Sequence, residues 1–397
     1  MIPHSAILNK AKDRKFTADP AQAPTEDYHE ALRELEQEGE LEIQPVPEPF
    51  IEVTNKYGRT KKIPLEHTWH HKSCGQCGHI PGYSTSVFWI NRKLGLDYHD
   101  PTDQTSCTAW NYYASATSNA PAQAAVAIRN FAAARETGYF PIIHCATSYG
   151  HYKETRQQLI HSPELRKQVR GILAKLGKKL VLPEEIVHYS EWVHAVRDRI
   201  AERQVIDMSD VVATVHPACH YHKLVGEDAI YAPEVYGAQR SAIITATMQA
   251  LGAEVRDYST WADCCGFGFR HILVSRDFSR SFAVQRKIEV MKEEANPDVL
   301  ITHDTGCVTT LDQSQFAAKA HDRNVGLPVM SDSQIAAIAM GAHPYKVTQL
   351  HWHSTDCRPF LEKLGIDHRK AWAEFEAAVE LLKSGQKQYM TWEDADA

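Results

Sequence analysis

The feature that most constrains the fold of this chain is a short strand-to-helix segment that occurs twice. The segments IIHCATS (142–148) and ITHDTGC (301–307) each follow a predicted strand and precede a predicted helix. A second pair of related segments precedes them: TSCTAW (105–110) lies upstream of the first copy and ADCCGF (262–267) upstream of the second. Similar segments in the same order are typical of a duplicated structural unit.

The spacing of the landmark residues supports the duplication. Cys145 lies 38 residues after Cys107, and Asp304 lies 39 residues after Cys265. One short match alone would be weak, but two matches in the same order at nearly the same distance are better explained by duplication than by chance.

Predicted strands alternate with predicted helices through both halves. Apolar residues spaced three and four apart indicate helices, and short apolar runs indicate buried strands. The predicted helices cover 82–95, 121–138, 239–252 and 275–297, the predicted strands lie in 139–144, 210–219 and 297–303, and a strand followed by a helix is predicted in 326–341. This alternation implies parallel pairing. We expect an α/β fold of two pseudo-repeated halves, each a small parallel sheet flanked by helices, with cysteine loops converging at strand ends.

The chain divides into five predicted parts. They are an N-terminal extension (1–67), a first half (68–162), a helical connector (163–205), a second half (206–345) and a C-terminal segment (346–397). Prolines interrupt the extension on both sides of an acidic helical stretch (25–42), and we interpret it as a solvated arm or docking segment. The connector is predicted to be helical because it is charged and has few turn residues.

Composition limits the class of protein. The net charge is −7, and no long basic run is present, which argues against nucleic acid as a partner. The N-terminus lacks the apolar core of a signal peptide, and no stretch reaches the roughly 20 apolar residues that cross a bilayer. We therefore expect a cytoplasmic protein without a membrane span. In a reducing compartment, nine cysteines are better explained as metal ligands or catalysts than as disulfides.

Four cysteines of the second half form the stronger candidate site. Cysteines that follow parallel strands can meet at one edge of a sheet, although they are far apart in sequence. Thiolates are soft ligands that suit iron–sulfur clusters and, secondarily, zinc. The set is Cys219, Cys264, Cys265 and Cys307. The adjacent Cys264-Cys265 pair favours a multi-iron cluster over a small zinc site, and Gly266 allows close approach of the backbone.

The first half carries a weaker set. It consists of Cys74, Cys77, Cys107 and Cys145. The Cys74-x-x-Cys77 spacing is common to zinc and iron–sulfur sites alike, so zinc remains the main rival there, followed by an empty vestigial site.

Other polar residues have a simple and a functional interpretation. His216, His220 and His222 flank Cys219, and His303 precedes Asp304; one of them could donate a proton to a leaving thiolate, although a hydrogen-bonded or surface role is favoured for each individually. Cys357 lies in HWHSTDCRP, and we interpret it as a free cysteine in a packing segment because no fourth metal ligand is evident.

At these cysteines the sequence resembles the cysteine-rich CCG domains of the B subunit of heterodisulfide reductase. The family pattern is a lone Cys, then Cys-Cys-Gly, then Cys-x-x-Cys, twice. The resemblance covers about residues 70–345. In the second half, Cys219 matches the lone Cys, Cys264 and Cys265 the pair, and Cys307 the last Cys. In the first half, Cys74 with Pro81-Gly82 matches the lone-Cys loop, Cys107 the second paired Cys, and Cys145 the first Cys of Cys-x-x-Cys.

The chain also departs from that pattern. Ser106 stands at a paired-Cys position, Thr108 replaces the Gly, and Ser148 and Asp304 each replace a Cys. The resemblance, with Cys77 as an additional ligand, implies an ordinary four-cysteine [4Fe–4S] cluster in the first half. In the second half it implies a cluster of [4Fe–4S] or noncubane form with Asp304 as an oxygen ligand. That second site looks more like the reactive centre, so its catalytic residues would be Cys219, Cys264, Cys265, Cys307 and His303.

The long N-terminal region and the altered motifs look more like the B-type subunits of the heterodisulfide-reductase-like complex of sulfur oxidisers. In that family the partners are a flavin-binding A-type subunit, a ferredoxin-like C-type subunit and a lipoate-carrying protein. The resemblance implies an oxidoreductase subunit that handles disulfide or sulfane sulfur with electron transfer. The alternatives are a zinc-stapled, non-catalytic assembly subunit and a pure electron-transfer subunit.

Overall fold

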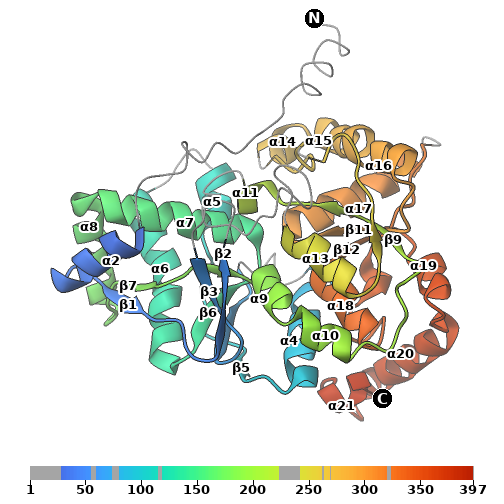
Figure 1. Cartoon of the computed structure of the whole chain (residues 1–397), viewed down its shortest axis with the longest axis horizontal. Coiled ribbons are helices and arrows are strands. Elements are labelled where there is room, and N and C mark those ends of the chain that lie inside the picture. The colour runs from blue at the N-terminus through green and yellow to red at the C-terminus, as the bar shows by residue number, and fades with distance from the viewer. Residues whose placement is uncertain are drawn as a thin grey trace, which may run out of the picture.

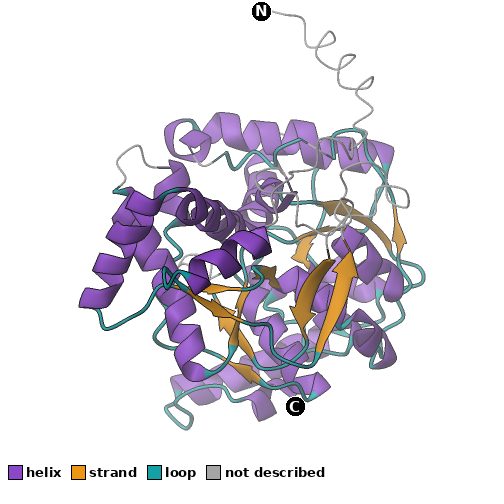
Figure 2. Ribbon diagram, turned by 60° about the vertical axis from the view of Figure 1, so that its left-hand side comes forward, coloured by secondary structure: helices purple, strands orange, loops and turns teal. Residues whose placement is uncertain are grey.

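The computed structural model describes most of the chain (Figures 1 and 2). The described residues are 28–54, 60–73, 80–114, 119–222, 242–261, 263–268, 270–319 and 323–396. Cys74, Cys77 and residues 223–241 lie outside them.

Two four-stranded sheets, parallel throughout, organise the fold. The first has the order β5-β4-β6-β8 and the second the order β10-β9-β11-β12. In both sheets the first strand along the chain lies second in the order, so the two sheets have the same topology. The strands of the first sheet are β4 (Thr68–His71), β5 (Tyr98–His99), β6 (Phe140–Ile143) and β8 (Val187–His188). Those of the second are β9 (Val212–His216), β10 (Glu254–Val255), β11 (Val299–Thr302) and β12 (Val329–Ser331). The predicted α/β fold with small parallel sheets is confirmed, whereas the duplication itself stays a prediction.

The central strands are apolar because helices cover both faces of each sheet. All four residues of β6 and all four of β11 are buried, which is typical of parallel strands. The first half contains α4 (Tyr83–Leu94), α5 (Ala109–Ala114), α6 (Ala120–Thr137) and α7 (Ala146–His161), and the connector contains α8 (Pro163–Lys175), α9 (Tyr189–Ala195) and α10 (Arg197–Glu202). In Figure 1 most of them lie on the left, in cyan and green.

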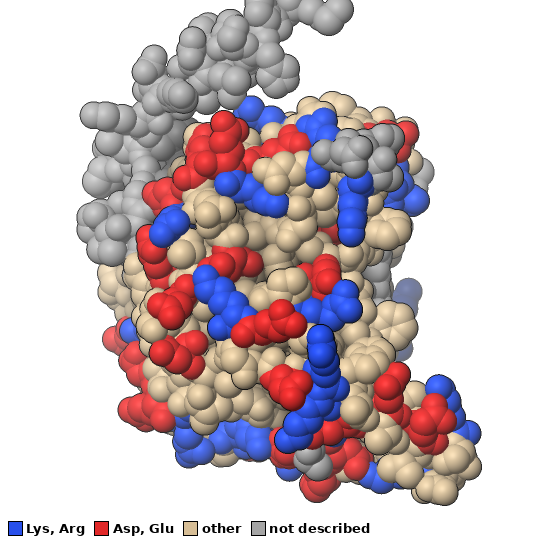
Figure 3. Space-filling view, turned by 90° about the vertical axis from the view of Figure 1, so that its right-hand side faces the viewer, with Lys and Arg blue, Asp and Glu red and all other residues tan. Residues whose placement is uncertain are grey.

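Most helices of the second half lie on the right of Figure 1, in yellow and orange. They are α11 (Cys219–His222), α13 (Ala242–Ala250), α14 (Arg270–Val274), α15 (Arg276–Ala283), the π-helical turn η2 (Val284–Ile288), α16 (Glu289–Glu294), α17 (Thr305–Lys319) and α18 (Asp332–Ala339). The C-terminal segment adds η3 (Leu350–Trp352), α19 (Arg358–Lys363), α20 (His368–Lys383) and α21 (Trp392–Asp396). On the face shown in Figure 3, basic and acidic side chains are intermixed.

Helix ends follow the sequence signals. Asn119 caps α6 by accepting a hydrogen bond from the Ala122 amide, and Gly138, at φ 80°, ends the helix in the left-handed conformation. The predicted helices over 82–95 and 121–138 are therefore confirmed, as are the strands β6, β9 and β11.

The interpretation of the N-terminal region as a solvated arm is wrong for its described residues. Helix α2 (Tyr28–Gln37) buries Tyr28, Leu32 and Leu35. Strand β1 (Glu42–Gln44) pairs with β7 (Val181–Pro183), and β2 (Phe50–Thr54) forms a hairpin with β3 (Thr60–Pro64). These apolar contacts fix the region against the first half.

The connector 163–205 is not helical throughout. After α8 it forms β7 and then β8, and β8 joins the first sheet as its edge strand beside β6. The run of Leu180 to Leu182 is fully buried, and this burial overrides the charged, helical character of its surroundings.

The loops that follow the central strands place the candidate residues. Cys145 follows β6 and precedes α7, and Asp304 follows β11 and precedes α17. The two halves are in direct contact, because α4 of the first packs against α18 of the second.

Candidate functional site

The four cysteines of the second set converge in space. Cys219 begins α11 just after β9, Cys307 lies in the first turn of α17, and the Cys264-Cys265 pair lies in the loop before α14. Hydrogen bonds link Cys219 with Cys264, Cys264 with Cys265, and Cys265 with Cys307. Thiols from three separate segments of the second half therefore lie close together.

The electrostatics of this thiol group are uneven. Hydrogen bonds donated by Cys219 and Cys265 and by the Gly266 amide hold the pKa of Cys264 far below its usual range. Those same bonds, together with burial, raise the pKa values of Cys219 and Cys265. The pKa of Cys307 is raised to about 11, because burial and the Asp304 carboxylate outweigh the hydrogen bond from Cys265. A metal ion that bound these sulfur atoms would take the place of the protons between them, since metal binding releases thiol protons.

Gly266 is required by the geometry of the loop. Its φ is 96°, and a Cβ there would lie 2.7 Å from the Ser279 carbonyl oxygen and 3.1 Å from the Ala283 amide nitrogen. The Ser279 hydroxyl donates to the Gly266 carbonyl at 2.5 Å. Glycine thus lets the Cys264-Cys265 loop lie directly against α15.

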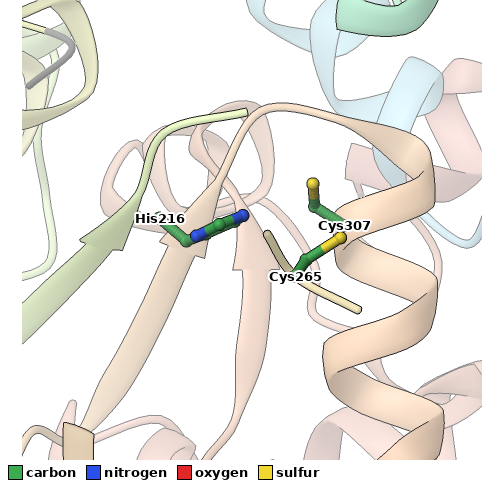
Figure 4. A group of neighbouring side chains, drawn as sticks. All are labelled: His216, Cys265 and Cys307. Carbon is green, nitrogen blue, oxygen red and sulfur yellow. The ribbon is translucent and has the colours of Figure 1, made fainter. Parts of the chain in front are cut away.

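His216 lies close to two of these thiols. It is the last residue of β9, and one of its imidazole nitrogens, Cys265 Sγ and Cys307 Sγ all lie within 4.8 Å of one another. All three residues are buried, and Figure 4 shows the imidazole extending toward the two sulfur atoms. Within the described part of the chain, this is the one group of three or more His, Cys, Asp or Glu side chains close enough to share a metal ion.

Asp304 joins the two halves. Its Oδ2 accepts a hydrogen bond from the Cys307 amide at 3.1 Å, which caps α17. Its Oδ1 accepts from the Thr147 amide at 3.0 Å, from the Thr147 hydroxyl at 3.2 Å and from the Cys145 thiol at 3.3 Å. Each carboxylate oxygen therefore has backbone donors, and the carboxylate spans the N-termini of α7 and α17.

His303 faces the loop that carries Cys219 rather than open solvent. The side chain is fully buried, and its Nε2 accepts a hydrogen bond from the Ala218 amide at 3.0 Å. In the neutral imidazole, the proton is then on Nδ1. This contact positions the residue that precedes Cys219.

The two described cysteines of the first set have different partners. The Ser148 hydroxyl donates to Cys107 Sγ at 2.9 Å, and the Ala109 amide approaches the same sulfur at 3.4 Å. Cys145 Sγ instead contacts Asp304 and, at 3.3 Å, the Thr305 hydroxyl. Cys145 thus lies at the boundary between the halves.

The loop of the first set mirrors that of the second. The Phe267 amide approaches Cys265 Sγ at 3.4 Å, as the Ala109 amide does Cys107 Sγ. Thr108 has φ 61°, although it is not a glycine, and it occupies the position that Gly266 has in the second loop. The side chain of Thr108 donates to the Cys107 carbonyl at 2.6 Å.

Cys357 lies apart from both sets, in the C-terminal segment. Its side chain is buried, its thiol donates to the Thr355 carbonyl at 3.5 Å, and burial raises its pKa. It borders a cavity of about 470 Å³ between η3, α19 and α20. These contacts agree with the interpretation of a packing cysteine.

Comparison with known proteins identifies the family. Residues 213–312 match the family described as a cysteine-rich domain (CCG). A protein of Archaeoglobus profundus that is named as similar to the B subunit of heterodisulfide reductase is 28% identical over 272 residues, which cover 67% of this chain and 88% of that protein. The B subunit of the ferredoxin:CoB-CoM heterodisulfide reductase of Methanosarcina acetivorans is 30% identical over 306 residues, which cover 74% of this chain and 95% of that protein. The chain belongs to the family of heterodisulfide reductase B subunits.

A solved structure shares the fold of this family member. The crystal structure of a hypothetical protein from Helicobacter pylori superposes with a TM-score of 0.57 at 16% sequence identity. The match covers 83% of this chain and 57% of that one, so the chain spans little more than half of the longer protein.

The cysteine-rich domain of this heterodisulfide reductase relative has the donors that an iron–sulfur centre needs. All four cysteines of the second set fall within the matched residues 213–312. Their mutually hydrogen-bonded thiols, of which those of Cys265 and Cys307 are buried, are soft ligands that suit iron–sulfur binding. No helix in the described ranges is both long and apolar enough to cross a bilayer.

The sequence did not predict the positions of two residues at this site, His216 and Thr147. The sequence suggested His216 only as a proton donor. It ends a strand three residues before Cys219, and residues at the ends of parallel strands often bind ligands. Thr147 was not singled out, because its role depends on Asp304 of the other half.

Proposed function

We propose that this protein is an iron–sulfur subunit of a heterodisulfide-reductase-like complex that handles disulfide or sulfane sulfur with electron transfer. The convergence of Cys219, Cys264, Cys265 and Cys307 carries the proposal. In a reducing compartment, four neighbouring thiols inside the matched cysteine-rich domain are better explained as metal ligands than as structural disulfides.

The second set is proposed to hold the reactive cluster. Iron–sulfur clusters carry single electrons, whereas disulfide chemistry takes two. Cys219 and Cys264 are partly exposed, whereas Cys265 and Cys307 are buried. The buried pair would anchor the centre, and the partly exposed pair would border the side from which a sulfur compound approaches. A noncubane form is compatible with the adjacent Cys264-Cys265 pair.

The first set is proposed to hold an ordinary [4Fe–4S] cluster that relays electrons. Cys74, Cys77, Cys107 and Cys145 would be its ligands. Support comes from Cys107, which is buried and accepts hydrogen bonds as Cys265 does. Cys145 would have to exchange its contact with Asp304 for a metal.

His303 and Asp304 are proposed to act on the reactive site through its surroundings. The Ala218 amide donates a hydrogen bond to His303, and through it His303 would position Cys219. A role of its Nδ1 as proton donor remains our prediction. Asp304 remains a candidate oxygen ligand, and its hydrogen bonds to both helices fit it equally to holding the halves together.

Partner subunits are part of the proposal. The curated relatives are named after heterodisulfide reductase and its B subunit, and one name includes ferredoxin and CoB-CoM. We propose a flavin-binding A-type subunit and a ferredoxin-like C-type subunit as partners, with a lipoate-carrying protein presenting sulfur in the cytoplasm.

Metal analysis tests the proposal. The full chain is reconstituted anaerobically with iron and sulfide, and iron, acid-labile sulfide and zinc are quantified in the wild type and in Cys265→Ser, Cys107→Ser and Cys357→Ser variants. We expect iron with sulfide, two separate EPR signals, loss of one signal in each of the first two variants, and no change in Cys357→Ser. Zinc without sulfide would support the zinc-stapled assembly subunit instead. Iron with sulfide but no effect of Cys265→Ser on the binding of a disulfide, only on electron flow, would support a pure electron-transfer subunit.

A further inference from the structure

We propose that His216 supplies a nitrogen ligand to the metal centre that Cys265 and Cys307 hold, so that this centre has mixed sulfur and nitrogen ligation. This inference rests on the proposed function and adds a ligand to its second site. Its basis is position: the imidazole nitrogen and the two Sγ atoms lie within 4.8 Å of one another, close enough to bind one metal centre.

The three residues approach from different elements. His216 ends β9, Cys265 lies in the loop after β10, and Cys307 lies in the first turn of α17. Figure 4 shows the imidazole extending from its strand toward the two sulfur atoms. A ligand carried at the end of a central strand is fixed by the sheet, because the Thr302 hydroxyl of β11 donates to the His216 carbonyl at 2.8 Å.

Burial favours a protein ligand at this place. His216 is 1% exposed, and Cys265 and Cys307 are each 3% exposed, so the pocket around them excludes bulk water. Imidazole nitrogen is an accepted ligand of iron, and it replaces a thiolate in some iron–sulfur centres.

Asp304 is less suited than His216 to bind this metal centre. Its Oδ2 caps α17 through the Cys307 amide, and its Oδ1 accepts from two donors of Thr147 and from the Cys145 thiol. Turning the carboxylate toward a metal would leave these buried donors without their acceptor, which costs about 1–3 kcal/mol for each. His216 can bind without disturbing that network.

The first half supplies an internal comparison. His71 ends β4 and pairs with Ile143 of β6, as His216 pairs with Thr302 of β11. The Nε2–H of His71 donates to the Thr105 carbonyl at 3.1 Å, and the Tyr152 hydroxyl lies 3.4 Å from the same nitrogen. Two strand-end histidines in the same register thus have different contacts, and among the cysteines that the structure describes, a pair of sulfurs lies near the histidine of the second half.

Mixed ligation has a consequence for the cluster. A neutral imidazole in place of a thiolate makes the centre less negative by one charge, and such substitution raises the reduction potential. The centre of the second half would then be easier to reduce than the same centre with a cysteine at position 216.

The test uses the full chain reconstituted anaerobically, with histidine labelled with nitrogen-15 in one batch and unlabelled in another. Pulsed EPR of the paramagnetic state is expected to show a nitrogen coupling in the wild type that changes isotope with the label. The coupling should be lost in His216→Gln and retained in His71→Gln, the matched control. Iron-57 Mössbauer spectra of the same samples report the ligand change in any EPR-silent state, as loss of one distinct iron doublet.

A second variant guards against simple failure to fold. His216→Cys restores a ligand of a different kind, so the cluster should form, lack the histidine coupling and show a lower reduction potential than the wild type. A coupling that persists in His216→Gln, or a labelled wild type without any histidine nitrogen coupling, overturns the inference while leaving an iron–sulfur protein. Absence of iron and sulfide from the wild type would instead overturn the proposed function.

Discussion

Asp304 at the start of α17 accepts hydrogen bonds from both the backbone amide and the hydroxyl of Thr147 at the start of α7. The same carboxylate accepts the Cys307 amide. One side chain therefore caps a helix that carries a candidate ligand and holds the other half of the molecule in place.

Replacing Asp304 with alanine should destabilise the protein. The change removes a helix cap and a charged acceptor shared by several buried donors, so we expect the free energy of unfolding to fall by about 2–3 kcal/mol. Urea unfolding of the metal-free chain measures it. Asp367, which caps α20 at the surface by accepting from the Arg369 and Lys370 amides, provides the control, and Asp367→Ala should cost less. Equal losses in the two variants would contradict a role for Asp304 between the halves.

Neutralising Glu191 should be costly, because it forms a buried ion pair with Lys61 at 2.9 Å. Lys61 is 2% exposed and Glu191 is fully buried, and Glu191 also accepts from the Tyr221 hydroxyl. Glu191→Gln leaves an uncompensated buried ammonium group, and we expect a loss of about 3–5 kcal/mol in the free energy of unfolding.

The control for Glu191 is an exposed ion pair. Lys383 and Glu380 lie 2.8 Å apart on α20, with both side chains about two-thirds exposed. Glu380→Gln should leave the unfolding midpoint unchanged. Recovery of stability in a double variant Lys61→Met/Glu191→Leu would strengthen the assignment, whereas an unchanged midpoint in Glu191→Gln would refute it.

The contribution of Asp332 to the stability of the protein should fall as the pH rises from about 4 to about 6. Burial raises the pKa of this carboxyl to about 6, outweighing hydrogen bonds such as the one donated by the Tyr189 hydroxyl. The folded state then holds a proton that the unfolded state, with an ordinary pKa of about 4, has released. The contribution is complete below about pH 4 and is lost as the pH rises through about 6.

Asp332→Asn should remove this pH dependence. The amide keeps an acceptor for Tyr189 but does not titrate, so the difference in unfolding free energy between variant and wild type should change by about 3 kcal/mol across the window. Chemical denaturation at several pH values measures the difference. A constant difference from pH 4 to 7 would show that Asp332 does not titrate there.

Gly266→Ala should lower the iron content of the second site. A methyl group at this position would meet the Ser279 carbonyl oxygen at 2.7 Å, so the Cys264-Cys265 loop would have to move away from α15. Gly252 is the matched control: its φ is 88°, but the nearest atom to an added Cβ is 3.9 Å away. Gly252→Ala should cost about 1 kcal/mol of stability and leave the iron content unchanged. Equal iron content in both variants would mean that the loop is not fixed by contact with α15.

Much of the fold and the second site could be predicted from the sequence. The helical periodicity of 121–138, bounded by Asn119 and Gly138, is local and leads directly to α6. The meeting of Cys219, Cys264, Cys265 and Cys307 follows from parallel strands, whose ends share one edge of a sheet.

The rest depends on contacts between distant residues. Lys61 looks like a surface residue in a charged extension, and its burial becomes explicable only beside Glu191, which lies 130 positions later. The short strands β7 and β8 carry too few residues for a periodic signal, and pairing with β1 and β6 determines them. The contact between Cys145 and Asp304 likewise arises from the docking of the two halves, which no local pattern encodes.

The four thiols of the second set differ in their exposure to solvent. Cys219 and Cys264 are partly exposed to solvent, whereas Cys265 and Cys307 are buried. A sulfur compound that reacted at such a centre would approach from the side of the partly exposed pair, and electrons that left on the side of the buried pair would cross the dry interior of the protein.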